Sequence, residues 1–434
     1  MKFKTTLIAT AVILTCQIGH AQTAKEVAAE MRQMRDELRQ LRAELEGLKK
    51  QKAQAQTSPE VSTAAKTEVI EPTTASNTRR DSEPTTNAVN MFGYGELNFT
   101  RPKNNIAGSE ATARRAVLGF GYKFSERTRF AAELEVEHAV VSKDDSGEVA
   151  FEQLYVEHDI TDGLSAKMGL FLLPVGYMNE SHEPTRYYGV TRNLVETAII
   201  PSTWREMGIG FRGIQDSGLR WDAGVVTSFD LTKWPTDSAE TKESPLGAIH
   251  QEGQKAKAAS LGYYGALNFD GMPGVNFGGS LFQGGIGQKQ PDIASPNASV
   301  TLAEVHTKWQ VGPWDLSALA AQGRFHDVSA FNASGNGVNP VPDQFRGWYA
   351  QAAYRLWRKG DNSLVPFTRY ERVNTALGYS GLGGLAPAID PDTKVWTVGA
   401  SYYLHPQVVV KMDVQKYQNN SALDRFNMGL GFHY

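Results

Sequence analysis

The alternation of apolar and polar residues along the last three quarters of the chain is the feature that most constrains its fold. In the final segment Phe426, Met428, Leu430, Phe432 and Tyr434 occupy alternate positions, with Asn427, Gly429, Gly431 and His433 between them. Successive side chains of a β-strand point to opposite faces of a sheet, so a period of two predicts a strand with one apolar face.

Sixteen such segments can be counted between residues 91 and 434. They are 91–101, 113–124, 128–141, 148–160, 164–176, 205–215, 218–230, 257–269, 274–286, 298–311, 314–327, 343–358, 363–373, 393–405, 408–418 and 424–434. We therefore predict an all-β fold, in which residues 91–434 form a 16-stranded antiparallel transmembrane β-barrel.

The connections between these segments alternate in length. Those after even-numbered segments are short, whereas most after odd-numbered segments are longer, at 102–112, 177–204, 231–256, 287–297, 328–342 and 374–392; two odd ones, near 142–147 and 419–423, are short. Outer-membrane barrels have short periplasmic turns and longer outer loops. An even strand count then places both ends of the barrel on the periplasmic side.

A soluble β-sandwich would also alternate, but it rarely needs sixteen strands, a secretory signal and an aromatic final strand. The sequence holds no apolar run of about 20 residues, which a transmembrane helix requires. In the barrel interpretation the apolar stripe faces lipid, and the charged, glycine-bearing stripe lines an aqueous lumen.

Residues 1–21 have the form of a signal peptide, with Lys2 and Lys4, an apolar run near residues 7–14, and Ala21 before the expected cleavage site. The chain's one cysteine, Cys16, lies inside this segment, so the mature chain would have none. That excludes a disulfide framework, a thiolate metal site and a cysteine nucleophile. The alternative is a lipoprotein acylated at Cys16, but Thr15 fits a lipobox poorly.

Residues 22–50 carry a heptad repeat, which predicts a short α-helical coiled coil that would stand in the periplasm. The seam spacings alternate between three and four, and the seam residues are Val27, Met31, Met34, Leu38, Leu41, Leu45 and Leu48. Glu30, Glu37 and Glu44 precede Arg35, Arg42 and Lys49 by five residues each, a charge pattern that pairs parallel chains. We interpret this seam as a trimerisation element, although Leu at both core positions does not choose strongly between two and three strands.

Residues 51–90 are rich in Ala, Thr, Ser, Glu and Pro, and they form the expected flexible linker.

The connection 177–204 is the candidate functional segment, because its tyrosines, its Ile199-Ile200 pair and Trp204 argue against disorder. A loop this apolar would be costly to expose, so we expect it to fold inward and narrow the pore. The candidate constriction residues are Glu180, His182, Glu183, Arg186, Tyr187, Arg192 and Glu196. Charges in a narrow pore select ions. The alternative is that pairs such as Glu183 with Arg186 only hold the loop in shape.

Charged residues on the predicted inward faces of the strands complete the candidate site. The candidate lumen-lining residues are Arg115, Lys123, Lys167, Arg205, Glu206, Arg212 and Lys411. Glu133, Glu135, Glu137 and Asp413 share these faces.

The chain combines the signal peptide, the helical extension, the sixteen strands, the aliphatic segment 168–176 before the third long loop, and the aromatic final strand. In these features it resembles the phosphate-selective porin O/P family of outer-membrane proteins. The resemblance covers residues 91–434, and it implies a trimeric porin whose third loop folds into each pore. Members of that family conduct phosphate or polyphosphate through a lumen rich in arginine and lysine. Residues 90–434 of this chain have 31 Lys and Arg against 36 Asp and Glu, a net charge of −5, so the solute stays open.

We predict a passive porin for small hydrophilic solutes or ions in a Gram-negative outer membrane, with homo-oligomers, membrane lipid and small solutes or anions as partners. It is not expected to be an enzyme, or to have a cofactor, a metal or a nucleic-acid partner. His182-Glu183 lacks the second histidine of a metalloprotease helix, and Pro184 would break that helix. Two alternatives remain: a barrel hydrolase with its triad on the lipid face, and an envelope tether acting through the coiled coil.

Overall fold

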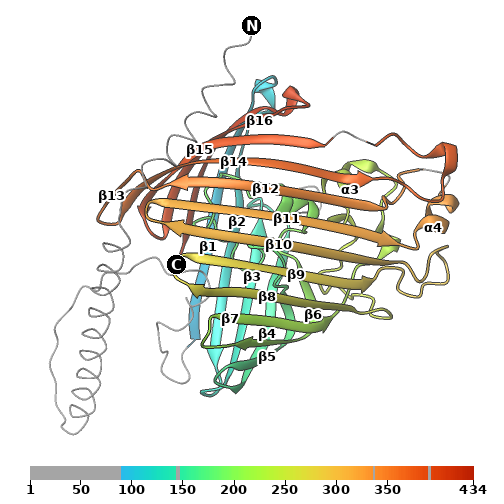
Figure 1. The fold of residues 1–434 in the computed structure, drawn as a ribbon, viewed down its shortest axis with the longest axis horizontal. Helices are drawn as coiled ribbons and strands as arrows, with labels where there is room; N and C mark the ends of the chain where they lie inside the picture. The colour runs from blue at the N-terminus through green and yellow to red at the C-terminus, as the bar shows by residue number, and fades with distance from the viewer. Residues whose placement is uncertain (1–88, 143–146, 336–337, 390–391) are drawn as a thin grey trace, which may run out of the picture. The chain divides into compact units, whose positions relative to one another are not determined.

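In the computed structural model, which describes residues 89–142, 147–335, 338–389 and 392–434, the strands form one closed antiparallel barrel (Figure 1). The strands are β1 (Val89–Pro102), β2 (Glu110–Lys123), β3 (Thr128–Glu137), β4 (Val149–Thr161), β5 (Leu164–Leu172), β6 (Arg205–Ile214), β7 (Leu219–Val226), β8 (Gly262–Met272), β9 (Val275–Gly285), β10 (Ser299–Val311), β11 (Trp314–His326), β12 (Gln344–Tyr354), β13 (Trp357–Lys359), β14 (Asn362–Leu377), β15 (Thr393–His405), β16 (Val408–Tyr417) and β17 (Arg425–His433).

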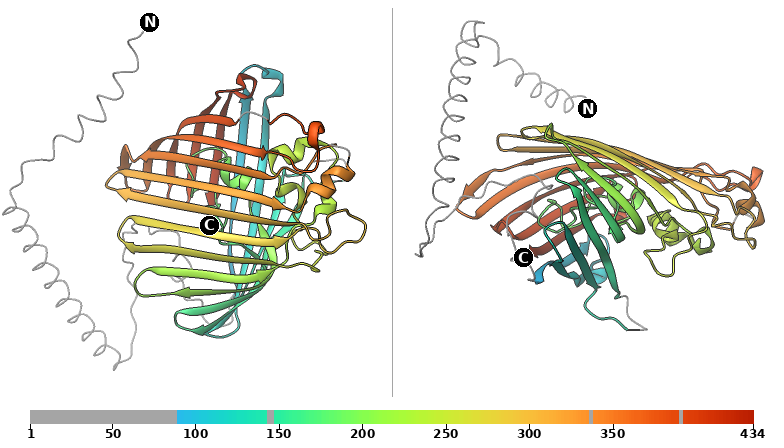
Figure 2. Two further views of the ribbon diagram at one scale, coloured as in Figure 1. Left: turned by 45° about the vertical axis from the view of Figure 1, so that its right-hand side comes forward. Right: turned by 90° about the horizontal axis from the view of Figure 1, so that it is seen from below.

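The barrel is closed because β1 pairs with both β2 and β17. The segments β12 and β13 both pair with β14 and are two parts of one barrel strand. The described residues therefore form a barrel of sixteen strands, and this prediction is confirmed. Figure 2 shows how the sheet curls back on itself. The predicted signal peptide (1–21), coiled coil (22–50) and most of the linker (51–90) lie outside the described residues.

Several strand ends differ from the predicted segments, and three strands illustrate this. The strand predicted at 128–141 ends at Glu137, because His138 and Ala139 have φ angles of 55° and 61°, which a strand does not allow. The strand predicted at 164–176 ends at Leu172, and the chain then turns at Gly176 with φ 76°. The strand predicted at 257–269 is instead Gly262–Met272, because it extends into the short turn.

The two faces of the barrel wall have opposite polarity. On β16, Met412 and Val414 are 47% and 53% exposed, whereas Asp413 between them is 2% exposed. Because side chains alternate along a strand, the exposed aliphatic row faces outward and the polar row faces the lumen. The same pattern holds on β15, where Val398 is exposed and Thr397 is buried.

The two ends of the barrel differ. The connections at the end where β1 begins have two to four residues, whereas those at the opposite end have seven to 35. We call these the short-turn end and the long-loop end. The long loops contain only short helices: α3 (Ser238–Glu243), α4 (Ser329–Ser334), the π-helix η2 (Val195–Ile199) and the 3-10 turns η1 (Ile106–Gly108), η3 (Leu231–Lys233), η4 (Gly247–Ile249), η5 (Gly383–Leu385) and η6 (Ser421–Leu423). Among the described helices, none has the length and apolar character needed to cross a membrane.

An apolar core joins the loops after β7, β9 and β11. Phe229, Leu231, Ile249 and Ile286 are fully buried in it. The backbone N–H of Leu231 also donates to the carbonyl of Ile286. These loops therefore pack together at the long-loop end.

Candidate functional site

Residues 173–204, which connect β5 to β6, lie inside the barrel, and we call them the inward loop. At its base the side-chain amide of Asn179 donates to the carbonyls of Leu173 and Trp204, each over 2.8 Å. The backbone N–H of Trp204 donates back to the Asn179 side-chain oxygen over 2.7 Å. The two ends of the loop are thus joined before it crosses the lumen.

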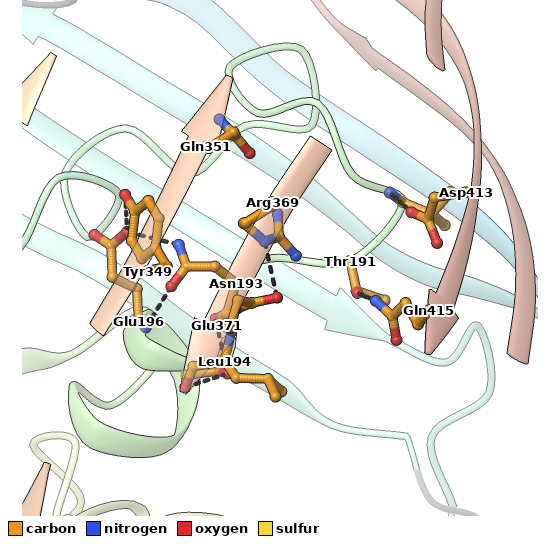
Figure 3. A network of polar contacts seen from close by, with 12 residues as sticks. Thr191, Asn193, Leu194, Glu196, Tyr349, Gln351, Arg369, Glu371, Asp413 and Gln415 are labelled. Carbon is orange, nitrogen blue, oxygen red and sulfur yellow. Dashed lines mark hydrogen bonds and ion pairs between the residues drawn. The ribbon is translucent and has the colours of Figure 1, made fainter. Parts of the chain in front are cut away.

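The π-helix η2 is held by one carboxylate. Glu196 accepts hydrogen bonds from the backbone N–H groups of Tyr177 and Met178. It also accepts from the Asn193 amide and from the Tyr349 hydroxyl on β12 (Figure 3). Burial raises the pKa of Glu196, while the hydrogen bonds from Asn193 and the backbone oppose that rise. This side chain, 4% exposed, organises the loop internally.

Three alternate inward residues of β16 hold the loop backbone. Lys411 donates to the Gly189 carbonyl over 2.9 Å, and Asp413 accepts from the Val190 N–H over 2.7 Å. Gln415 donates to the Thr191 hydroxyl over 3.0 Å (Figure 3). Since inward side chains recur at every second residue, one strand meets three consecutive loop residues.

A further contact to the loop comes from β14. Glu371 accepts the backbone N–H of Leu194 over 2.5 Å and pairs with Arg369 over 2.9 Å. Both charged side chains are almost fully buried. The loop is therefore fastened to β14 as well as to β12 and β16.

A charge cluster lies between the loop and strands β1 to β3. The Tyr187 hydroxyl donates to Glu96, and the Lys411 ammonium lies 3.6 Å from the centre of the Tyr187 ring. Arg115 is 3.3 to 3.6 Å from carboxylate oxygens of Glu96, Glu135 and Glu137. At 7% exposure its guanidinium is enclosed by protein.

His182 joins the loop to β4. Its Nδ1 donates to the Asn179 carbonyl over 2.9 Å, and its Nε2 lies 3.6 Å from a Glu152 oxygen. Because both ring nitrogens face oxygen acceptors, the doubly protonated imidazolium fits this position. Burial alone would lower the pKa of His182, but the Glu152 carboxylate raises it above the ordinary value of 6.5.

This pair predicts a pH-dependent stability. A raised histidine pKa contributes stability in full below about pH 6.5, and the contribution is lost as the pH rises through the folded-state pKa. We expect His182→Asn to flatten this part of the profile of Tm against pH between about pH 6 and 9. An equally steep profile in the variant would contradict this role for His182.

A second set of charged side chains on the loop and the wall is only partly buried. Glu180, 24% exposed, accepts from Arg212 on β6 over 2.7 Å and lies 3.6 Å from Lys167 on β5. Burial acts to raise the pKa of Glu180, but the charges of Arg212 and Lys167 hold that pKa well below its usual range. Arg212 also contacts Asp222 on β7.

A second group of charged residues lies near Tyr403 on β15. The charges of Lys308, Arg186, Arg355 and Asp315 all act on its hydroxyl, which donates to the Thr185 carbonyl of the loop. Lys308 pairs with Asp315 over 3.2 Å, and Asp315 also accepts from the Tyr188 hydroxyl. Asp315 and Tyr403 thus link β11 and β15 to the inward loop, through Tyr188 and Thr185.

The candidate constriction residues separate into two sets. His182, Tyr187, Arg192 and Glu196 are 4–8% exposed, and each bonds to the loop itself or to the wall. Arg192, for example, donates to Ser202 and to the His182 carbonyl. Glu180, Glu183 and Arg186 are only partly buried.

Most candidate lumen residues face inward, with one exception. Arg115, Lys167, Glu206, Arg212 and Lys411 lie on inward faces, and Lys123 pairs with the exposed Glu126 at the short-turn end. Arg205 instead shares the face of exposed Met207 and Ile209, and it pairs with Glu252 of the loop after β7 over 2.9 Å. Arg205 and Glu206 are neighbours in a strand, so they cannot both face the lumen.

Lys308, Asp315 and Arg355 are not among the residues predicted from the sequence. Lys308 and Asp315 stand on the inward alternation of β10 and β11, so the period of two could have placed them on the correct face, whereas Arg355 directly follows the end of β12. Their nearness to the loop depends on pairing between distant strands.

An uncharacterized protein of Aquifex aeolicus (strain VF5) is 31% identical to this chain over 336 residues, covering 75% of this chain and 74% of that protein. No family model matches the chain. Among solved structures, the Salmonella typhi OmpF complex with daunomycin has a TM-score of 0.55 at 13% identity, covering 80% of this chain and 98% of that one.

The outer membrane channel DcaP of Acinetobacter baumannii has a TM-score of 0.52 at 10% identity, again covering 80% of this chain and 98% of the other. A loop L8 deletion mutant of the outer membrane protein OmpT of Vibrio cholerae has a TM-score of 0.50 at 11% identity, covering 81% of this chain and 100% of that one. These likenesses show a common barrel fold.

Proposed function

This chain belongs to the same family as the uncharacterized Aquifex aeolicus protein, and we propose that it is an outer-membrane porin through which small hydrophilic solutes diffuse passively. The observation that carries the proposal is the inward loop, which crosses the lumen of a sixteen-stranded barrel whose outer face is apolar. Barrels of this width leave an aqueous channel, whereas an anchor needs only about eight strands. A loop inside such a channel sets its narrowest point.

The outer face supports a membrane location. At the short-turn end the ring of Trp314 contacts Tyr354 and that of Trp357 contacts Tyr402; nearer the long-loop end, Tyr370 contacts Trp348 and Trp396. Trp396 and Tyr402 are six residues apart on β15, or about 20 Å along the strand. Apolar bands of roughly this height between aromatic girdles are typical of outer-membrane barrels.

We infer that the permeation path runs beside Glu180, Glu183 and Arg186, which keep solvent exposure. The buried residues His182, Tyr187, Arg192 and Glu196 would then position the loop and not touch the solute. This division follows from exposure, because a side chain enclosed by protein cannot line a water-filled path.

For the solute we propose small anions, phosphate among them. Arg186, Lys308 and Arg355 all lie within electrostatic range of Tyr403, as does one carboxylate, Asp315, which pairs with Lys308. A low-dielectric wall strengthens the field of such a group, so the local charge balance outweighs the net charge of the chain. The barrel's overall negative charge is mostly placed elsewhere, as in Glu133, Glu135 and Glu137.

Reversal potentials in a salt gradient test this proposal. We expect Arg186→Ala and Lys308→Ala each to shift the reversal potential toward cation preference, because each removes a positive charge that is only partly buried in the lumen. Arg192→Ala serves as the matched control, since that guanidinium is 8% exposed, and it should leave the ion preference nearly unchanged. An unchanged preference in both test variants would show that these charges do not line the path.

We also propose a homo-oligomer, a trimer by the family resemblance, with the heptad seam in the periplasm. The support is the sequence of residues 22–50, which lie outside the described part of the chain. Deleting residues 22–89 separates a porin from an envelope tether. If envelope integrity fails while bilayer conductance is retained, the tether is a second role of the same protein.

A further inference from the structure

A row of cations lies on the outer face of the barrel near the long-loop end. Five neighbouring barrel strands each contribute one, and the five are Arg324 on β11, Arg346 on β12, Arg372 on β14, Lys394 on β15 and Lys416 on β16. Lys394 is partly exposed, and the other four are exposed. Their strand neighbours at two residues' distance include exposed Trp348, Trp396 and Val414, which place the row on the lipid-facing side.

The five residues lie eight to eleven positions from the short-turn ends of their strands. Arg324 lies ten residues after the start of β11 at Trp314, and Arg372 lies ten residues after the start of β14 at Asn362. Lys394 lies eleven residues before the end of β15 at His405. A transmembrane strand takes about 9–11 residues to cross a bilayer. If the short-turn ends of the strands lie at one membrane interface, the row therefore lies at the opposite interface.

The row has no counterpart on β7 to β10. At the corresponding level of β7 to β10 the outward residues are uncharged, namely Val225, Tyr263, Gln283 and Thr301. Within the described ranges, Arg372 pairs with Asp392, and the other four cations form no ion pair. The arc on β11 to β16 thus presents positive charge without an equal number of carboxylates.

We propose that this cationic row binds the phosphate-bearing headgroup of a lipid in the membrane leaflet at the long-loop end. Guanidinium forks bind phosphate oxygens in a bidentate manner, and lysine adds a point charge. The aromatic side chains directly below the row lie where the acyl chains of such a lipid would begin. A second copy of this chain is a poorer occupant, because a symmetric contact through this row would bring like charges together.

Lipid A, a phosphorylated glycolipid, is a suitable probe for this site on the full chain in an uncharged detergent. The test variant is Arg346→Gln with Arg372→Gln and Lys394→Gln, and the control is Arg358→Gln with Lys359→Gln, two exposed cations at the short-turn end. Native mass spectrometry then counts the retained lipid. We expect the test variant to bind lipid A about ten-fold more weakly, with the control variant like the parent.

Several outcomes would overturn the inference. Equal lipid A binding in all three proteins would do so, as would its displacement by millimolar inorganic phosphate, which would indicate a site for free anions. A changed oligomeric state with unchanged lipid binding would make the row a subunit contact. Planar-bilayer conductance of the same variants tests the porin function separately, because headgroup binding does not require an open pore.

Discussion

A channel that lacks the inward loop should conduct ions much better than the parent. We expect deletion of residues 180–202, with two glycines joining Asn179 to Thr203, to raise single-channel conductance at least about two-fold, because the loop occupies the lumen cross-section. Asn179 already bonds to Trp204, so the new ends lie close together. Single-channel recording in a planar bilayer measures the change.

The control for this experiment shortens a different loop, the one that follows β7 at the long-loop end. Deleting residues 238–243 removes α3 from the loop after β7 and leaves the inward loop intact. Its conductance should stay close to that of the parent. If instead the inward-loop deletion conducts like the parent, the narrowest point lies elsewhere in the barrel.

The largest loss of stability is expected on removing Arg115. It contacts carboxylates on β1 and β3, at Glu96, Glu135 and Glu137, so Arg115→Met would leave buried acids without a counter-charge. Breaking a buried ion pair from one side costs about 3–5 kcal/mol. We expect a loss of that size in the free energy of unfolding, measured by urea titration with tryptophan fluorescence in detergent micelles.

Lys123→Met is the matched control on the same strand. Lys123 pairs with Glu126, whose side chain is 81% exposed, and an exposed pair contributes about 0–1 kcal/mol. Equal, small losses in both variants would show that the acids around Arg115 are neutral in the folded protein.

The strands and their faces were predictable because they rest on local information. A period of two is a property of consecutive residues, and it gives each strand two different faces wherever one meets lipid and the other water. Each of the sixteen segments therefore matches an observed strand within a few residues. Arg205 shows the limit of this approach, since the first residue of a strand has no earlier alternation to assign its face.

The inward position of the loop was predictable in kind but not in detail. Its apolar and aromatic content argued against exposure, yet the residues that hold it lie far away in the chain. Val190 bonds to Asp413 and Leu194 bonds to Glu371 across separations of 223 and 177 residues. No local pattern relates such pairs, and so the role of Asp413 as a contact of the loop backbone was not foreseen.

The sequence by itself therefore determined the barrel, its strand count, its lipid and lumen faces, and which loop is too apolar to lie in water. The tertiary structure decided which loop charges are buried as supports and which stay accessible, because burial depends on the strands that close around the loop. It also decided that cations from five separate strands stand in one row. Both results depend on strand register, which is set by pairing between segments and not by neighbours in the chain.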